Sequence, residues 1–281
     1  MIIENADSRK YTSLRAGGHV KQLYIPDSLA QLSQFLSTNN LPVMALGLGS
    51  NLLLRDQGFD GVMIKLSQLN HMSIEDDVVE VEAGTTLAKL ARFADSKQLS
   101  GVEFLSAIPG NVGGALAMNA GCFGSEMWDL VLEVSTMDRS GKQHQRSKDD
   151  FVVAYRQVQS KFTNEIFISA RLKLGREPGL ANTKALLEQR NLTQPIGLPS
   201  CGSVFKNPPG HYAAKLIEDS GLKGFCIGGA CVSEKHANFI INQNQASASE
   251  IENLIQHIQS VVKSKFDVEL EVELKIVWLQ Y

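Results

Sequence analysis

The spacing of apolar residues in the first third of the chain predicts short strands and one helix. Val20–Ile25 is typical of a strand, and the four apolar positions that follow fall on one helical face: Leu29, Leu32, Phe35 and Leu36. Asp27 or Ser28 is the predicted cap of that helix, because both side chains accept hydrogen bonds from a first helical turn. The apolar runs Leu41–Leu46 and Gly61–Leu66 are predicted as buried strands.

Alternating apolar and polar positions predict further strands in the middle of the chain. The segments with this pattern are Val78–Glu82, Leu130–Asp138 and Glu165–Lys173. Thr85 or Thr86 is predicted to begin a helix after the first of them. The run from Arg139 to Lys142 is predicted to turn the chain after the second.

Helical spacing dominates the last third of the chain. The predicted helices are Lys184–Arg190, Tyr212–Ser220 and one that begins at about Ser247 with a capping box to Glu250. The charged segment 176–191 carries Pro178-Gly179 and is predicted as a linker that runs into the first of these helices. Because strands and helices mix without a repeating βαβ period, the predicted fold class is α+β.

Composition and charge narrow the classes of partner. The chain has 281 residues, 43% of them hydrophobic and 20% charged, which is enough for two or three domains with their own cores. The formal net charge is −3 and no block of Lys or Arg occurs, so neither nucleic acid nor a membrane is an expected partner. Without a signal-like N-terminus or a long apolar run, we expect a cytoplasmic protein, either a monomer or a weak oligomer.

The cysteines do not indicate a metal or redox site. Cys122, Cys201, Cys226 and Cys231 show no C-x-x-C spacing. We therefore expect no metal and no redox pair, and four thiols in a chain of this length suit a reducing compartment.

A glycine-rich stretch, Gly101–Gly124, is the first candidate for a binding site. It contains Pro109-Gly110, which marks a turn, and Gly113-Gly114, where a backbone or ligand can approach closely. Ala115–Ala120 is predicted as the first turns of a helix whose free N–H groups face a phosphate. The alternative is that Gly113-Gly114 only packs one element tightly on another.

A second glycine cluster lies between two apolar runs, in the sequence ALGLGSNLLL of residues 45–54. Gly47 and Gly49 begin like a dinucleotide fingerprint, but Leu52 stands where that fingerprint needs its third glycine, and the LLL run of residues 52–54 is typical of a strand rather than a helix. A Rossmann site is therefore excluded. What remains is a strand, loop and strand whose amides, with Ser50 and Asn51, form a candidate anion nest.

These two stretches resemble the FAD-binding domain of the vanillyl-alcohol-oxidase type. The C-terminal third carries CGSVFKNP at residues 201–208, HYAAKLIEDSGLKG at 211–224, GGACVSEKHANFIIN at 228–242 and LEVELKIVW at 270–278. These motifs, in this order and spacing, resemble the UDP-N-acetylenolpyruvoylglucosamine reductase family. The resemblance runs from about Tyr11 to the C-terminus and is closer to the shorter type, which lacks an inserted tyrosine-bearing loop.

The resemblance implies an FAD-binding domain at 1–175, in subdomains of about 1–66 and 67–175. It also implies a smaller α+β substrate-binding domain at 182–265 and a C-terminal strand at 266–281. FAD would bind non-covalently, NADPH would donate hydride, and UDP-N-acetylglucosamine enolpyruvate would be the substrate, reduced to UDP-N-acetylmuramate for peptidoglycan synthesis. The implied FAD contacts are Gly47, Gly49, Ser50, Asn51, Pro109, Gly110, Gly113, Gly114, Asn119 and Gly121.

Three residues match the family's catalytic positions. Arg156 matches the arginine that reaches the substrate carboxylate, although Val158 replaces the serine that usually follows it. Ser203 matches the serine that delivers a proton, and Glu273 the active-site glutamate. Chemistry alone favours other interpretations. Arg156 would be an exposed strand arginine in a surface pair, and Ser203 a loop serine bonded to its own backbone. Glu273 would belong to a solvated acidic edge face, since Glu269, Glu271 and Glu273 alternate onto one face of a strand.

Four further residues are implied substrate contacts: Asn207, Lys206, His236 and Asn238. A solvated lysine and structural roles for His236 and Asn238 are the alternatives. Two other functions stay open on composition alone, namely an FAD oxidase or dehydrogenase acting on a sugar or alcohol, and a nucleotide-binding regulatory module.

Overall fold

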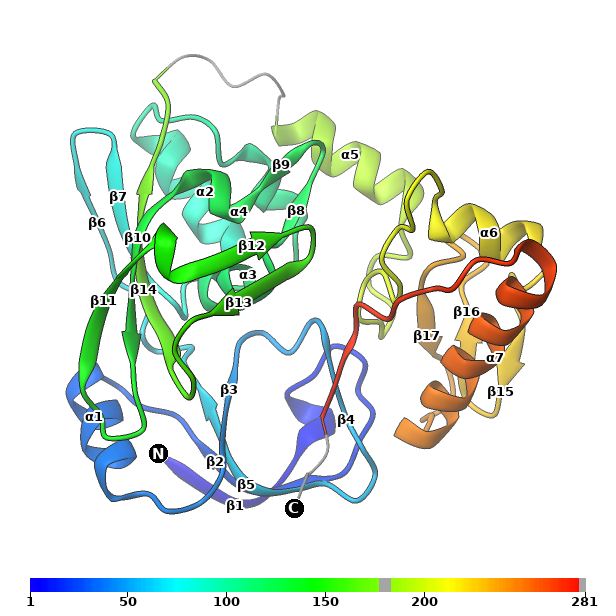
Figure 1. The fold of residues 1–281 in the computed structure, drawn as a ribbon, viewed down its shortest axis with the longest axis horizontal. Coiled ribbons are helices and arrows are strands. Elements are labelled where there is room, and N and C mark those ends of the chain that lie inside the picture. Colours follow the sequence, from blue (N-terminus) through cyan, green and yellow to red (C-terminus); the bar gives the residue numbers. More distant parts are fainter. Residues whose placement is uncertain (177–182, 278–281) are drawn as a thin grey trace. The chain divides into compact units, whose positions relative to one another are not determined.

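The computed structural model describes residues 1–176 and 183–277 (Figure 1). The chain forms two compact units that alternate along the sequence. The first unit contains Met1–Ile3, Leu23–Leu48 and Val62–Gln189, and the second contains Glu4–Gln22, Gly49–Gly61 and Arg190–Tyr281. The predicted linker residues Pro178-Gly179 lie outside the described residues.

An antiparallel five-stranded sheet of order β11-β10-β14-β7-β6 belongs to the first unit (Figure 1). Its strands are β6 (Met72–Glu75), β7 (Val78–Glu82), β10 (Val131–Met137), β11 (Gln143–Ser147) and β14 (Ile166–Lys173). The predicted strands in this region are therefore confirmed. Their alternating apolar residues, among them Val81, Val134 and Leu172, enter one buried core.

Four helices of the first unit begin where a side chain can accept a hydrogen bond from the backbone. They are α1 (Leu29–Thr38), α2 (Leu87–Ser96), α3 (Val112–Met118) and α4 (Met127–Leu130), with the 3-10 helices η2 (Glu103–Ala107) and η3 (Lys148–Asp150). Ser28 caps α1 and Thr86 caps α2, which decides between the two predicted candidates in each case. Helix α3 packs on β7 and β14 and carries the second half of the glycine-rich stretch.

The remaining strands of the N-terminal part form one sheet and two short ribbons. The sheet has the order β1-β2-β5-β3, with β1 (Ile2–Asp7), β2 (His19–Tyr24), β3 (Val43–Leu46) and β5 (Phe59–Lys65), and the 3-10 helix η1 is Ser8–Lys10. Strands β3 and β5 run parallel, with Val43 opposite Val62. The ribbons are β8 (Gly121–Cys122) with β9 (Ser125–Glu126), and β12 (Phe151–Ala154) with β13 (Gln157–Ser160).

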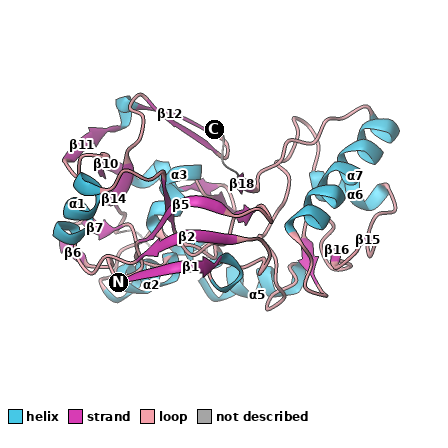
Figure 2. Ribbon diagram, turned by 90° about the horizontal axis from the view of Figure 1, so that it is seen from below, coloured by secondary structure: helices cyan, strands magenta, loops and turns pink. Residues whose placement is uncertain are grey.

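In the second unit, helices α6 (Ala213–Asp219) and α7 (Ala248–Phe266) pack beside a small antiparallel sheet (Figures 1 and 2). The sheet contains β15 (Cys226–Ile227), β16 (Ala230–Val232) and β17 (Ile240–Asn242), and α5 (Thr183–Thr193) precedes it in the chain. Ser247 and Glu250 form the predicted capping box of α7. Strand β4 (Leu52–Leu54) pairs in parallel with β18 (Lys275–Val277), a pairing that the sequence does not predict.

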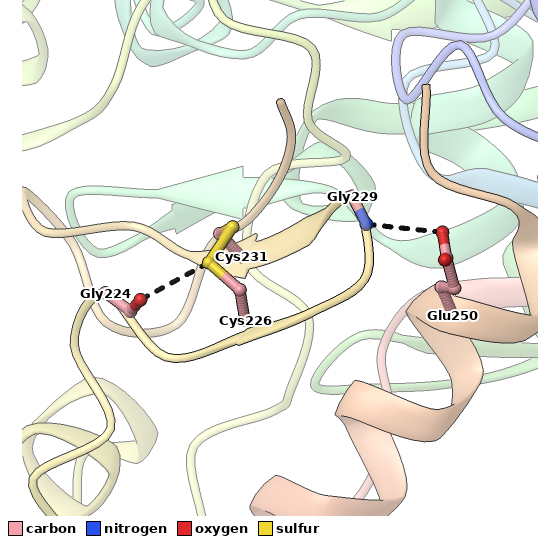
Figure 3. Close-up of a disulfide and its surroundings, with 5 residues drawn as sticks. All are labelled: Gly224, Cys226, Gly229, Cys231 and Glu250. Carbon is pink, nitrogen blue, oxygen red and sulfur yellow. Dashed lines mark hydrogen bonds between the residues drawn. A yellow bond between two sulfur atoms is a disulfide. The ribbon is translucent and has the colours of Figure 1, made fainter. Parts of the chain in front are cut away.

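The expectation of no redox pair is wrong. Cys226 and Cys231 lie directly opposite each other in the β15–β16 hairpin and form a disulfide (Figure 3). The Gly228-Gly229 turn of this hairpin contacts the first turn of α7, where the Gly229 N–H donates to Glu250 Oε2 at 3.3 Å. The pair was missed because the spacing of the two cysteines fits no motif and only the hairpin register brings them together. Cys122 and Cys201 are not part of a disulfide.

Candidate active site

The glycine stretches meet at a small cavity in the first unit. The cavity has a volume of about 200 Å³, and its wall includes Gly47 after β3, Asn111 before α3, and Gly113 and Gly114 in the first turn of α3. Gly47 packs so closely that an added Cβ would lie 2.3 Å from Asn111 Oδ1. Only glycine therefore fits at Gly47 without moving Asn111.

The first turn of α3 does not offer the free N–H groups that the sequence predicts. Val112 N–H donates to Thr85 O at 2.9 Å, and Gly113 N–H donates to Ala83 O at 2.8 Å. Gly114 N–H donates to the Asn111 side chain at 3.2 Å, which makes Asn111 the N-cap. Gly113 thus packs tightly on its neighbour, as in the alternative interpretation, while both glycines still line the cavity.

The wall of this cavity carries a carboxylate as well as glycines. Glu165 lines the cavity, but its carboxylate is bound by two guanidinium nitrogens of Arg146, so its charge is compensated. The glycine walls of this cavity fit the close backbone approach that part of an extended dinucleotide such as FAD requires.

Arg156 lies in the two-residue turn of the β12–β13 hairpin rather than within a strand. Its φ of 55° is left-handed, which few non-glycine residues adopt. Its Nη2 donates to Gly121 O at 2.6 Å and its Nη1 to Asn119 O at 3.4 Å, so the guanidinium is held by the backbone that follows α3. The interpretation as an exposed strand arginine is therefore wrong. Val158, in β13, lies opposite Val153.

Asn119 ends α3 in a left-handed conformation and uses its amide within the protein. Its Nδ2 donates to Glu126 Oε2 at 2.7 Å and to Ala154 O at 3.2 Å, and its Oδ1 accepts from Trp128 N–H at 3.1 Å. The side chain therefore joins α3 to α4 and β12, and its carbonyl supports Arg156. Pro109 and Gly110 precede α3, and Gly110 O accepts from Leu87 N–H at the start of α2.

In the second unit, Ser203 and Glu273 are neighbours across a backbone ladder. Glu273 N–H donates to Val204 O at 2.8 Å, and Val204 N–H donates to Asn238 O at 2.9 Å. Gly202, with φ of +76°, turns the chain just before Ser203. Burial raises the pKa of the Cys201 thiol to about 12, and the nearby negative charge of Glu273 adds to this effect. The segment 201–204 and Glu273 therefore share one site.

The three alternating glutamates separate in the structure. Glu271 pairs with Lys206 at 2.6 Å, and Glu269 lies 3.3 Å from Lys263. Glu273 lies before β18 rather than within it, and its backbone carbonyl accepts from Asn51 Nδ2 at 3.1 Å. The structure thus distinguishes Glu273 from its neighbours, which strand alternation does not.

The implied substrate contacts lie around the same segment. Asn238 is buried and binds the Phe205 backbone twice, accepting from its N–H at 2.9 Å and donating to its carbonyl at 2.8 Å. Asn207 Oδ1 accepts from Ala213 N–H at the start of α6. Lys206 forms the ion pair with Glu271 and is not a freely solvated lysine.

The surroundings of His236 favour its neutral imidazole form. Burial lowers its pKa, and the positive charge of Lys223 lowers it further. The ring packs edge-on against Phe239, and its buried Nδ1 has no hydrogen-bond partner among the described residues.

The glycine loop, residues 47–51, is divided between the two units, and its residues from Gly49 to Asn51 belong to the second unit. Gly49 has a φ of +73°, and an added Cβ would lie 2.1 Å from Tyr11 O. Ser50 lies between Gly49 and Asn51 and is partly exposed. Sequence reasoning missed two residues that hold these loops: Asn111 in the first unit, which caps α3, and Ser13 in the second, whose hydroxyl donates to Ser200 O. The position of Asn111 before Val112-Gly113-Gly114 is a cap signal that could have found it, whereas no sequence signal marks Ser13.

Comparison with known proteins assigns a class and a family. Residues 21–147 match a family model described as an FAD binding domain, and residues 194–277 match the C-terminal domain of UDP-N-acetylenolpyruvoylglucosamine reductase. The class is therefore that of FAD-binding oxidoreductases, and the predicted α+β fold with an FAD-binding domain is confirmed.

Individual relatives agree over nearly the full length. Reductases of this name from Nitrosomonas eutropha and Legionella pneumophila strain Corby are each 47% identical, over 96% and 98% of this chain and 86% and 92% of their own. The crystal structure of the reductase from Thermus caldophilus matches with a TM-score of 0.82 and 31% identity, over 98% of both chains. The chain belongs to the UDP-N-acetylenolpyruvoylglucosamine reductase family.

The described residues contain neither a candidate membrane span nor a candidate metal cluster. No helix among residues 1–176 and 183–277 is both long and apolar enough to span a membrane. Within the same ranges, no group of three or more His, Cys, Asp or Glu side chains could hold a metal ion.

Proposed function

We propose that the chain reduces UDP-N-acetylglucosamine enolpyruvate to UDP-N-acetylmuramate, with NADPH as the hydride donor, in peptidoglycan precursor synthesis. Family membership supports this reaction. The structural observation that supports it most directly is that Ser203 and Glu273 lie in one site, joined by the bond from Glu273 N–H to Val204 O. When bound, FAD supplies two-electron chemistry, taking hydride from NADPH and giving it to the terminal alkene carbon. The glycine loops at Gly47–Asn51 and Pro109–Gly121 would hold it, while the domain boundaries inferred from the sequence stay a proposal.

Arg156 stabilises the charge that develops on the substrate. Hydride addition to the terminal carbon pushes an electron pair through the second alkene carbon into the attached carboxylate, which then carries two negative charges. A guanidinium is permanently charged and offers a rigid set of donors to such a group. The bonds to Gly121 O and Asn119 O fix the orientation of the guanidinium before the substrate arrives, which supports this role.

Ser203 delivers the proton that completes the reduction. A hydroxyl is a weak acid in water, but the dianionic enolate is a strong base, so a well-placed serine is sufficient. The turn at Gly202 and the backbone bonds of Val204 hold Ser203 close to Glu273. Glu273 is the active-site glutamate in this scheme, and its carboxyl group helps to orient the Ser203 hydroxyl.

The remaining assignments concern binding. His236 belongs to the substrate pocket through the family motif in which it lies, and Lys206 offers its ammonium to a phosphate group, with Glu271 holding that ammonium in place. Asn207 and Asn238 shape the same segment through their bonds to Ala213 and Phe205. We further propose a cytoplasmic enzyme, monomeric or weakly oligomeric, with no nucleic-acid or membrane partner, in line with its net charge of −3.

The test is a stepwise absorption experiment on the purified protein under anaerobic conditions. The flavin bands should bleach with NADPH and recover only when the enolpyruvyl substrate is added. A colourless protein that takes up no FAD would refute the proposal. Recovery with oxygen alone, and none with the substrate, would favour an FAD oxidase instead.

The role of Ser203 is tested in the two half-reactions. Ser203→Ala should leave bleaching by NADPH nearly intact and slow substrate-dependent recovery by roughly two to four orders of magnitude, the range for loss of a proton donor. Ser203→Cys keeps a proton at this position and should lose less. Equal loss in both half-reactions would contradict proton donation by Ser203.

A further inference from the structure

A single serine in the N-terminal segment joins two parts of the second unit that the sequence separates widely. The Ser13 hydroxyl donates to Ser200 O at 2.6 Å and lies 3.3 Å from Gly49 O. The Ser13 N–H donates separately to Gly49 O at 2.9 Å. One residue therefore contacts both the glycine loop and the backbone that leads into Ser203.

The bond to Ser200 fixes one end of the turn that carries Ser203. Ser200 also bridges to Ile241 of β17, and only Cys201 and Gly202 separate Ser200 from Ser203. The other end is fixed at Val204, which is bonded to Asn238 and Glu273. Gly202 adopts a left-handed φ between these anchors, and a Cβ added there would meet nothing within 4 Å. The position of the Ser203 hydroxyl therefore depends on these two anchors and on Cys201, which is buried in the core between them.

The glycine loop is bonded to the other catalytic residue as well. Asn51 Nδ2 donates to Glu273 O at 3.1 Å, and Lys275 N–H reaches Asn51 O at 3.3 Å. Gly49 is packed against Tyr11 and Thr12 without room for a side chain. The loop is thus attached to the backbone around Ser203 through Ser13 and to Glu273 through Asn51.

We propose that Ser13 is a positioning residue for proton delivery, acting through Ser200 on Ser203. The inference rests on the proposed function, in which Ser203 protonates the substrate and the glycine loop contacts FAD. The Ser13 hydroxyl binds Ser200 O and the Ser13 N–H binds Gly49 O. Ser13 thereby fixes the position of the proton donor Ser203 relative to the glycine loop. Ser13 itself touches neither the substrate nor the cofactor in this scheme.

The geometry makes the test selective. The hydroxyl has one proton, and its short bond goes to Ser200 O, whereas Gly49 O is also bound by the Ser13 N–H. Ser13→Ala therefore removes the bond to Ser200 and keeps the backbone anchor of the glycine loop. Ser8→Ala is the matched control, because the Ser8 hydroxyl is fully buried in the same unit and has no hydrogen-bond partner in the part of the chain that the structure describes.

The experiment measures the two half-reactions of the FAD-loaded enzyme separately. Ser13→Ala should slow substrate-dependent recovery of the flavin bands about tenfold or more, as a small misplacement of a reacting group does. Bleaching by NADPH, FAD content and substrate affinity should stay at the wild-type level, and Ser8→Ala should match wild type throughout. Ser13→Cys, a weaker donor of similar shape, should fall between wild type and Ser13→Ala, and it carries the test if the alanine variant does not fold.

The double variant separates positioning from a merely structural role. If Ser13 acts through Ser203, adding Ser13→Ala to Ser203→Ala should cause no further slowing of recovery. Additive losses, or equal slowing of bleaching and recovery in Ser13→Ala, would overturn the inference. If substrate-dependent recovery is as fast as wild type in Ser13→Ala but slow in Ser203→Ala, the inference about Ser13 is overturned while the proposed function stands. A wild-type rate in Ser203→Ala would instead remove the proposed proton donor.

Discussion

Replacing Asn238 tests whether its buried amide supports the backbone of the active-site segment. Both polar ends of the Asn238 side chain bind Phe205, one accepting from its N–H and the other donating to its carbonyl. Phe205 is 1% exposed and Asn238 is 4% exposed, so water has little access to either. Asn238→Ala removes both partners at once and leaves two backbone groups of Phe205 buried.

The magnitude follows from these two groups. A buried donor or acceptor that loses its partner costs about 1–3 kcal/mol, so two such groups predict a loss of about 2–6 kcal/mol in the free energy of unfolding. Water entering the space left by the shorter side chain would place the value near the lower end. The loss is large compared with the total stability of an ordinary domain, about 5–15 kcal/mol.

The loss in the free energy of unfolding is measured by unfolding Asn238→Ala and wild type in denaturant. Circular dichroism follows the transition, with FAD present at one fixed concentration. Asn244→Ala is the control, because Asn244 is exposed and close in sequence, and its change should stay within about 0.5 kcal/mol. A loss in Asn238→Ala no larger than in the control would refute the reasoning, since it would mean that the Phe205 backbone groups find other partners.

Two further predictions concern the cysteines. Reduction of Cys226–Cys231 opens a loop with a sequence separation of 5, which should lower the free energy of unfolding by about 2 kcal/mol; the double variant Cys226→Ser with Cys231→Ser should be insensitive to dithiothreitol, and an equal response in both proteins would contradict this. Cys201, with its pKa raised to about 12 by burial, should resist alkylation at pH 8, where only about one thiol in ten thousand is ionised. Mass spectrometry after iodoacetamide treatment checks this, and modification of the folded protein at the rate of a free thiol would rule it out.

The local elements could be predicted because their signals are local. Ser28, Thr86 and Ser247 cap their helices through bonds to residues three positions away, and such spacing is visible in a sequence. The strands β10 and β14 alternate with the period of a half-buried sheet. Neither signal depends on the rest of the chain.

The arrangement of the candidate site could not be predicted from patterns. Arg156 lies in a hairpin turn that contains no Gly, Pro or Asn, so the segment has the appearance of a continuous strand. Glu273 could be chosen among three glutamates only by resemblance, because the lysine partners of Glu271 and Glu269 become known only from the structure. The Cys226–Cys231 disulfide depends on hairpin register, which the spacing of the two residues does not reveal.

The interleaving of the two units has a consequence for folding during synthesis. The core of the second unit contains Leu14 and Leu53 together with Leu274. This core therefore cannot pack completely until the ribosome has released the segment around Leu274. The first unit is complete at Gln189. Until the C-terminal segment of the second unit is synthesised, the apolar side chains of residues 4–22 and 49–61 therefore stay exposed to solvent. A nascent chain stalled shortly before β18 should thus expose these segments to chaperones and proteases, while the first unit already resists them.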